Sequence, residues 1–254
     1  MKIKQLAILL TMAALLSSLS YRIALGWQVA PSKPHRAFSW IETEYKLTGA
    51  TSAVPIRTQR HAVRADGSRA DAMLDRDGNV LSRLVILPNE RKMVSIYEDL
   101  KVITTVYLEQ QRADNYKGYT GNDTCSNISI KSLAGEEQVM GYRTFKYTST
   151  GSLDGETATF TSWNAPDLDC IALRGSLELT ANGKTTKSAK EISNLQLGDP
   201  DAWLFMIPSD YQEMSPSAVE RLRGEKLGRP VPPLVLEHAA KSDERYYQSQ
   251  QNRP

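Results

Sequence analysis

The stretch that decides the fold is Val80 to Leu87, which reads Val-Leu-Ser-Arg-Leu-Val-Ile-Leu. A second stretch of the same kind, Val102 to Leu108, reads Val-Ile-Thr-Thr-Val-Tyr-Leu. Both are short and rich in apolar and β-branched residues, which predicts β-strands. Both also carry large apolar side chains on each face of the strand, because successive side chains point to opposite faces.

A strand that is apolar on both faces needs a cover on each. In an antiparallel sheet one face often meets water. Burying four such side chains is worth about 6–12 kcal/mol, which a marginally stable fold does not leave in water. The cover can be a helix, a second sheet or a bound apolar ligand. The residues predicted to line such a ligand are Leu84, Ile86, Val102, Val106 and Tyr107.

Strand and turn signals continue on both sides of these stretches. From Phe38 to Thr48, apolar and charged side chains alternate as in a half-buried strand. Asp66-Gly67, Asp77-Gly78 and Asn182-Gly183 are typical of hairpin turns, because glycine readily adopts positive φ. Short strands joined by such turns predict a mainly β (β-rich α+β) fold built on an antiparallel sheet. Further strands are expected near residues 56–64, 68–74, 79–87, 92–98, 101–108, 139–149, 156–164, 175–181 and 185–197.

Helix signals are few and lie near the C-terminus. Residues 201–205 predict one helical turn capped by Asp201, and residues 215–223 predict a short helix with a proline near its first position. Residues 234–250 fit either a terminal helix or a disordered segment, and Glu109 to Asn127 is expected to be a polar loop. The expected organisation is a lead-in segment at 21–36, an antiparallel β domain at 37–215, and a short helix, Pro-rich linker and C-terminal tail at 216–254.

Residues 1–20 have the three-part layout of a secretory signal peptide. Lys2 and Lys4 give a positive start, Leu6 to Leu16 is an apolar run, and Ser18-Leu19-Ser20 supplies small residues before the cleavage point. The run is shorter than the roughly 20 apolar residues of a membrane span. We expect a periplasmic or secreted protein that is soluble after cleavage. The alternative is an uncleaved N-terminal anchor in the inner membrane.

The charge balance argues against one class of partner. The chain carries 31 Lys and Arg against 29 Asp and Glu, and loss of the two lysines of the signal brings the net charge close to zero. Because no cluster of basic residues remains, nucleic acid is not an expected partner.

Cys125 and Cys170 are the two cysteines of the chain. In an exported protein an even count indicates a disulfide. The bridge would close a loop of about 45 residues, for which the chain-entropy model gives roughly 4 kcal/mol. The alternative is two buried free thiols.

No catalytic motif stands out in the sequence. It contains no His-Glu-x-x-His, Cys-x-x-Cys, Gly-x-Ser-x-Gly or phosphate-loop pattern. The histidines are His35, His61 and His238, and nothing indicates that they join the three or four converging ligands of a metal site. We therefore expect no enzyme activity, no metal and no cofactor.

Three segments carry a family resemblance: Glu137–Tyr147, Trp163–Cys170 and Leu197–Tyr211. Together they resemble a group of uncharacterised exported bacterial β-rich proteins. The last segment, Leu-Gly-Asp-Pro-Asp-Ala-Trp-Leu-Phe-Met-Ile-Pro-Ser-Asp-Tyr, is also similar, more loosely, to the end of the outer-membrane lipoprotein carrier and sorting (LolA-like) superfamily. That resemblance implies one curved, largely antiparallel sheet with a few short helices, whose concave face holds an acyl chain. The sequence departs from the carriers in lacking the long helices that close their cavity.

The closing segment also has a structural interpretation. Gly198-Asp199-Pro200 predicts a turn, after which Trp203 or Phe205 is expected to plug one end of the sheet. We expect these aromatic side chains to belong to the core rather than to a binding site.

Three hypotheses for function follow. The leading one is an exported, non-catalytic envelope protein whose curved sheet binds an acyl chain, a similar lipid or a lipidated partner. The alternative is a structural or protein-interaction module that uses the sheet edges and the C-terminal tail from Gly228 to Pro254. The third is a hydrolase that uses His61 with a nearby carboxylate.

Overall fold

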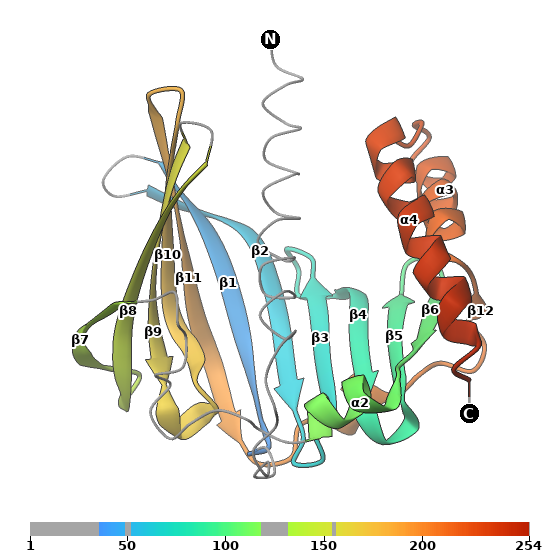
Figure 1. The fold of residues 1–254 in the computed structure, drawn as a ribbon, viewed down its shortest axis with the longest axis horizontal. Helices are drawn as coiled ribbons and strands as arrows, with labels where there is room; N and C mark the ends of the chain where they lie inside the picture. The colour runs from blue at the N-terminus through green and yellow to red at the C-terminus, as the bar shows by residue number, and fades with distance from the viewer. Residues whose placement is uncertain (1–35, 49–51, 118–131, 154–155, 254) are drawn as a thin grey trace. The chain divides into compact units, whose positions relative to one another are not determined.

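The computed structural model describes residues 36–48, 52–117, 132–153 and 156–253, whose strands form one open twelve-stranded sheet (Figure 1). The strand order is β12-β6-β5-β4-β3-β2-β1-β11-β10-β9-β8-β7. All neighbouring pairs are antiparallel except β12 and β6, which run parallel. The strands are β1 Phe38–Thr48, β2 Ser52–Val63, β3 Arg69–Leu74, β4 Val80–Leu87, β5 Lys92–Tyr97, β6 Val102–Tyr107, β7 Ser132–Val139, β8 Tyr142–Leu153, β9 Glu156–Ala165, β10 Ile171–Ala181, β11 Lys184–Leu197 and β12 Gln212–Glu213.

The predicted fold class, mainly β with one largely antiparallel sheet, is confirmed. Figure 1 shows strands β3 to β5 facing the viewer, whereas β7 to β10 are seen closer to edge-on, so the sheet turns strongly along its width. The predicted signal peptide and Cys125 lie outside the described residues, and so does all but the last residue of the lead-in segment. The signal peptide, the lead-in segment and the disulfide therefore remain predictions.

The predicted hairpin turns form where glycine supplies positive φ. Gly67, Gly78 and Gly183 have φ of +84°, +86° and +70°, and they join β2 to β3, β3 to β4 and β10 to β11. Asn182 has φ of +51°, so both central residues of the Asn182-Gly183 turn lie in the region that a type I′ turn requires. The register of these hairpins therefore depends on turn residues that can be recognised from the sequence.

One predicted strand is divided in two. The strand expected at 139–149 is wrong as a single element, because β7 ends at Val139 and β8 begins at Tyr142. Between them Met140 and Gly141 adopt φ of +55° and +81°, which makes a tight turn. Val139 and Tyr142 consequently face each other across the hairpin.

The polar loop predicted from Glu109 is also wrong over its first part. Residues Gln110–Lys117 form helix α2, while the rest of the predicted loop, from 118, lies outside the described residues. The helix buries Ala113 in a cluster with Leu108 and Ile86 of β4, against which Tyr116 packs. Tertiary contact on one side thus stabilises a helix whose composition is polar overall.

The C-terminal residues form two helices, α3 Pro216–Lys226 and α4 Pro233–Gln250. The helix predicted at 215–223 is confirmed and extends slightly further, and of the two options for 234–250 the structure has the helix. The backbone N–H of Ser217 donates to Asp243 at 2.9 Å, and Gln250 Nε2 donates to the carbonyl oxygen of Thr105 on β6 at 3.0 Å. The tail is therefore fixed to α3 and to the sheet. No helix in the described part of the chain is both long enough and apolar enough to cross a membrane.

The β2–β6 half of the sheet has a different cover on each face. On one face, which we call the motif face, the closing segment packs over the strands as the turn η3 Ala202–Phe205 and the residues after it. The buried residues of this cluster are Ala62, Ala70, Ala72, Val85, Val94, Ile96, Leu204 and Phe205. The opposite face, which we call the helix face, carries Ile86 and Met93, against which α2 packs.

The expectation for the closing aromatics is confirmed for Phe205 and wrong for Trp203. Phe205 is 6% exposed and belongs to the core, whereas Trp203 is 40% exposed. Asp201 stands at the start of the turn but its side chain makes no capping hydrogen bond. It lies instead 3.5 Å from Arg60 on β2, so an ion pair to the sheet replaces the predicted cap.

Arg83 fastens the closing segment to the sheet. Its side chain is 5% exposed and its Nε donates to Glu98 at 2.6 Å. One terminal nitrogen donates to the carbonyl oxygens of Trp203, Leu204 and Met206 at 2.8, 3.1 and 2.9 Å, respectively. The second oxygen of Glu98 accepts a hydrogen bond from Tyr211 at 2.7 Å. The buried guanidinium of Arg83 thus joins the sheet to the closing segment through charge-assisted hydrogen bonds.

Candidate ligand-binding face

The strand register brings four of the five predicted lining residues onto the helix face. Ile86 pairs with Met93, and Met93 with Val106. Leu84 stands two residues from Ile86 on the same strand, and Val102 stands four residues from Val106, so both point to the same side. Tyr107 follows Val106 directly and therefore points to the motif face, where it pairs with Lys92. Tyr107 does not share a surface with the other four.

The helix face carries these four apolar side chains together with the polar Ser95 and Thr104, which pair between β5 and β6, and the described residues cover it only in part. Val102 is 2% and Ile86 7% exposed, while Leu84 and Val106 are half-buried. Helix α2 covers the end of this face at Ile86. Toward the other end, the guanidinium carbon of Arg223 on α3 lies 5.2 Å from the ring centre of Tyr97, and burial raises the pKa of the Tyr97 phenol. We call Leu84, Ile86, Val102 and Val106 on β4 to β6 the apolar strip. Of these four side chains, Leu84 and Val106 remain half-buried.

A polar row borders this strip on β1 to β3. Trp40 pairs with His61 across the first two strands, and His61 pairs with Asp71 across the next two. The rings of Trp40 and His61 stack with centres 4.8 Å apart, and His61 Nδ1 lies 2.6 Å from Asp71 Oδ1. Asp71 in turn faces Leu84. The apolar strip and the polar row are therefore continuous.

The histidine of the hydrolase hypothesis does have a carboxylate beside it. However, His61 Nε2 is buried and has no hydrogen-bond partner, so no nucleophile among the described residues is in contact with it. The described residues also contain no group of three or more His, Cys, Asp or Glu side chains arranged to hold a metal ion. Nucleophilic catalysis needs base and nucleophile within hydrogen-bond reach, and the described residues place no nucleophile there.

Comparisons with known proteins give a likeness of fold. No protein-family model and no curated protein matches the sequence. A solved structure of MucB in complex with MucA(peri) matches with a TM-score of 0.39 and 15% identity, over 70% of this chain and 56% of that chain. A LolA superfamily protein of Nitrosomonas europaea matches with a TM-score of 0.31 and 9% identity, over 68% and 91%. The Mycobacterium tuberculosis lipoprotein LppX matches with a TM-score of 0.30 and 15% identity, over 62% and 85%.

The superfamily that the closing segment resembles is therefore represented among the similar structures. The chain spans little more than half of the MucB chain. The likeness concerns the fold alone.

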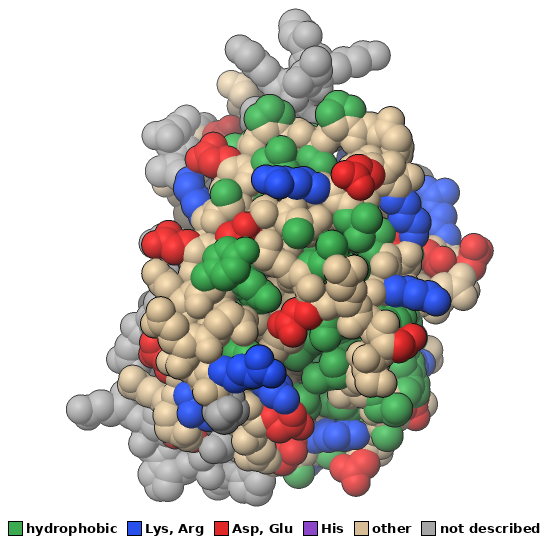
Figure 2. Space-filling model, turned by 90° about the vertical axis from the view of Figure 1, so that its right-hand side faces the viewer, with side chains coloured by type: hydrophobic (Ala, Val, Ile, Leu, Met, Phe, Trp, Pro, Cys, Tyr) green, Lys and Arg blue, Asp and Glu red, His purple; other side chains and the backbone are tan. Residues whose placement is uncertain are grey.

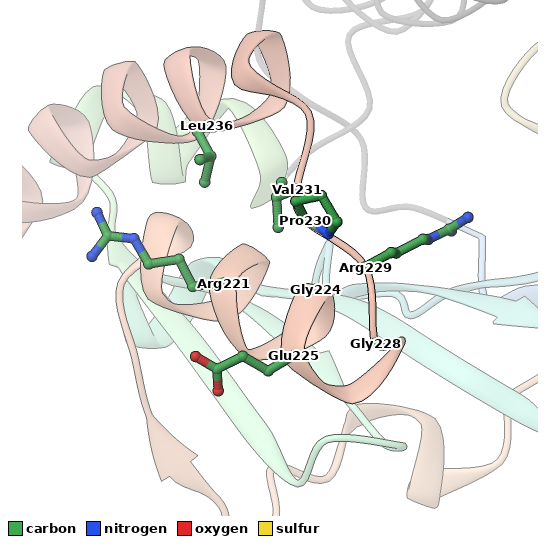
Figure 3. Close-up of a pocket in the computed structure, with 8 residues that line it drawn as sticks. All are labelled: Arg221, Gly224, Glu225, Gly228, Arg229, Pro230, Val231 and Leu236. Atoms are coloured by element: carbon green, nitrogen blue, oxygen red, sulfur yellow. The ribbon is translucent and has the colours of Figure 1, made fainter.

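The structure has open hollows away from the helix face. One, of about 460 Å³, lies on the motif face beside Arg83, Glu98 and Trp203. Another, of about 480 Å³, lies between α3 and the start of α4 (Figure 3). Figure 3 shows Leu236 and Val231 directed into the space between the helices, with Arg229 directed away from it. None of the five predicted lining residues borders either hollow.

The residues that sequence analysis missed are Arg83, Glu98 and Tyr211. A signal was present, because Arg83 is the one charged residue of the apolar stretch Val80–Leu87, and a charge inside a buried strand requires a partner. The sequence does not reveal which residues pair with Arg83, since Trp203 is 120 residues away along the chain.

Surface charge gives no indication of a polyanionic partner on the side that carries α3 and α4. Figure 2 shows this side with basic and acidic side chains scattered between apolar ones. A continuous basic stripe, as used to bind a phosphate backbone, is not visible in that view. The C-terminal tail that was predicted to contact a partner is the packed helix α4, and its binding to a partner remains a prediction.

Proposed function

We propose that this chain is a non-catalytic binding protein that shelters an acyl chain, or a lipid group of similar chemistry, on the helix face. The observation that carries the proposal is the common orientation of Leu84, Ile86, Val102 and Val106 on one side of β4 to β6. Leu84 and Val106 remain half-buried there, so an apolar ligand can remove further surface from water. Burying a fully exposed large aliphatic side chain is worth about 1.5–3 kcal/mol, so covering the exposed part of a half-buried one contributes roughly half as much.

The shape of the ligand follows from the surface. The apolar strip runs along neighbouring strands that are about 4.8 Å apart, with α2 at one end and Arg223 of α3 at the other. A linear chain of methylene groups can follow such a strip and contact several strands at once. A compact polar metabolite would leave the leucine and valine side chains without partners.

We also propose that the protein acts in the cell envelope after export. The layout of residues 1–20 supports this proposal. Purification of the protein from an envelope fraction and sequencing of its N-terminus tests it. A mature N-terminus at Tyr21 is expected, and a mature protein that retains residues 1–20 would contradict cleavage.

Binding is tested by titrating the purified protein with a dansyl-labelled fatty acid and following the dansyl fluorescence. The wild-type protein is expected to bind the probe. Leu84→Gln is expected to weaken binding about 3- to 10-fold, since covering the exposed part of a half-buried leucine is worth about 0.7–1.5 kcal/mol. The matched control is Leu81→Gln on the same strand, because Leu81 is already 42% exposed. The control is expected to bind within about twofold of wild type.

Two results would contradict the proposal. One is the absence of probe binding by the folded wild-type protein, together with the absence of lipid in organic extracts of protein taken from the envelope. The other is an equal effect of Leu84→Gln and Leu81→Gln, which would place the probe away from the helix face.

A further inference from the structure

Three side-chain nitrogens on the helix face are buried without a hydrogen-bond partner among the described residues. They are Trp40 Nε1 on β1, His61 Nε2 on β2 and Arg69 Nε on β3. In folded proteins the large majority of buried polar side-chain atoms have a partner, and a buried group left without one costs about 1–3 kcal/mol. Three such groups on adjacent strands of one face therefore call for a common explanation.

The register places the three residues together. Trp40 and His61 are opposite each other on paired strands, and their rings stack. Arg69 lies two residues before Asp71, the direct partner of His61, so Arg69 and His61 are diagonal neighbours, whose Cβ atoms lie somewhat less than about 7–8 Å apart. That separation is within the reach of an arginine side chain.

Arg69 is not neutralised by the described residues. No described carboxylate forms an ion pair with it, and its guanidinium lies instead 5.9 Å from the ring centre of Tyr116 on α2. The nearby Asp71 is engaged by His61 at 2.6 Å. Two further carboxylates on β1 have cations of their own, since Glu42 pairs with Lys190 at 2.9 Å and Glu44 with Arg57 at 3.1 Å.

The same three residues stand beside the proposed apolar strip. Arg69 pairs across the strands with Ile86, and Asp71 with Leu84. A ligand whose acyl chain covers the half-buried Leu84 can place its polar end beside Asp71, the strand partner of Leu84, and hence next to Arg69 and His61. This juxtaposition of a cation and hydrogen-bonding nitrogens with an apolar strip matches the two parts of an anionic lipid.

We propose that Trp40, His61 and Arg69 bind the anionic head-group oxygens of an acyl ligand, which rests on the proposed function of the helix face. Arg69 and the Trp40 indole supply N–H donors to a carboxylate or phosphate. Asp71 holds the Nδ1 proton of His61, which leaves Nε2 directed to the ligand. Nε2 donates when the ring is protonated and accepts from a protonated ligand oxygen when the ring is neutral.

The test compares ligands that share an acyl chain and differ in the head group. Oleate carries a carboxylate, oleoyl lysophosphatidate carries a phosphate and oleyl alcohol carries no charge. Competition with a neutral fluorescent acyl probe measures the affinity of each for the full-length protein. We expect oleate, lysophosphatidate or both to bind at least about tenfold more tightly than oleyl alcohol, and the tighter of the two identifies the head group.

Variants then assign the preference to the three residues. Arg69→Gln is expected to abolish the preference for the anionic ligand while the affinity for oleyl alcohol stays within about twofold of wild type. Trp40→Phe keeps an aromatic ring against His61 and removes the indole N–H, so it is expected to reduce the preference in part. The control is Arg57→Gln, which removes a cation already paired with Glu44 and is expected to leave the preference unchanged. Circular dichroism confirms that each variant is folded.

The outcomes separate this inference from the proposed function. Equal binding of all three ligands by the wild-type protein, or a preference that survives Arg69→Gln, would overturn the head-group site and leave acyl binding intact. Failure of every ligand to bind, oleyl alcohol included, would overturn both. An equal loss of affinity for charged and uncharged ligands in Arg69→Gln would make Arg69 a packing residue of the strip.

Discussion

Replacing Arg83 with methionine removes the contacts that hold the closing segment on the sheet while keeping an unbranched, apolar side chain in the space. The arginine donates to Glu98 and to the carbonyl oxygens of three closing-segment residues. In Arg83→Met, these carbonyl oxygens lose a charged donor. Glu98 keeps only its hydrogen bond from Tyr211.

The expected loss of stability is about 3–5 kcal/mol, the range observed when one partner of a buried ion pair is removed. Arg83 is 5% and Glu98 22% exposed at the side chain, so water compensates little on the arginine side. A simple sum of about 1.5–3 kcal/mol for each hydrogen bond to a charged group gives a larger figure. That sum overestimates the loss, because one nitrogen is shared among three carbonyl oxygens and Glu98 retains some solvent.

Urea unfolding followed by circular dichroism measures the effect, and thermal melting should show a midpoint lower by about 6–20 °C for a chain of this size. The matched control is Arg143→Gln. Arg143 also pairs with a glutamate through two hydrogen bonds of 2.9 Å, but its side chain is 60% exposed. Water and salt screen an exposed pair of this kind, so its loss should change stability very little. If Arg83→Met costs no more than Arg143→Gln, the fastening role assigned to Arg83 is refuted.

Three further outcomes are expected. The hydrogen bond to Glu98, with burial, raises the pKa of Tyr211 to about 12. The stability that this protonated phenol contributes is therefore fully present below about pH 10 and is lost between about pH 10 and 12. Urea unfolding of Tyr211→Phe should show a smaller loss of stability than wild type across that interval. At Gly224 a Cβ would lie 2.5 Å from a methyl of Val231 and 3.1 Å from the backbone oxygen of Arg229. Gly224→Ala should therefore destabilise the packing of the α3–α4 connection on α3 by about 1–3 kcal/mol, and faster proteolysis of the C-terminal helices than in wild type should reveal it. If Cys125 and Cys170 are bridged as predicted, reduction should add the mass of two hydrogen atoms and cost roughly 4 kcal/mol of stability; alkylation of both thiols without prior reduction would exclude the bridge.

The parts of the fold that could be predicted are those that depend on a few neighbouring residues. The Asn182-Gly183 turn follows from the φ preferences of two residues, and β4 follows from the composition of Val80–Leu87. The division at Met140-Gly141 was missed, because a methionine with positive φ has no strong sequence signal. Helix α2 was missed because its stability comes from contact with Ile86 and not from its own polar composition.

The candidate site was predictable in part for the same reason. Alternation along a strand identifies side chains that share a face, and the strand register places Leu84, Ile86, Val102 and Val106 on one face; their contact with a ligand remains a prediction. Including Tyr107 mixed two faces, since it follows Val106 directly. The unpartnered nitrogens of Trp40 and Arg69 had no signal, because only the burial of the folded chain distinguishes them from ordinary surface groups.

The sequence by itself determined that this chain is a largely antiparallel sheet with apolar side chains on both faces of its central strands. Those features follow from turn preferences and the two-residue period of a strand, which act over a few residues. Tertiary structure alone decided that Trp203 stays out of the core and that Arg83 meets a segment 120 residues away. These outcomes depend on which distant groups come together in a space with little water, and that information is not present in any local stretch of the chain.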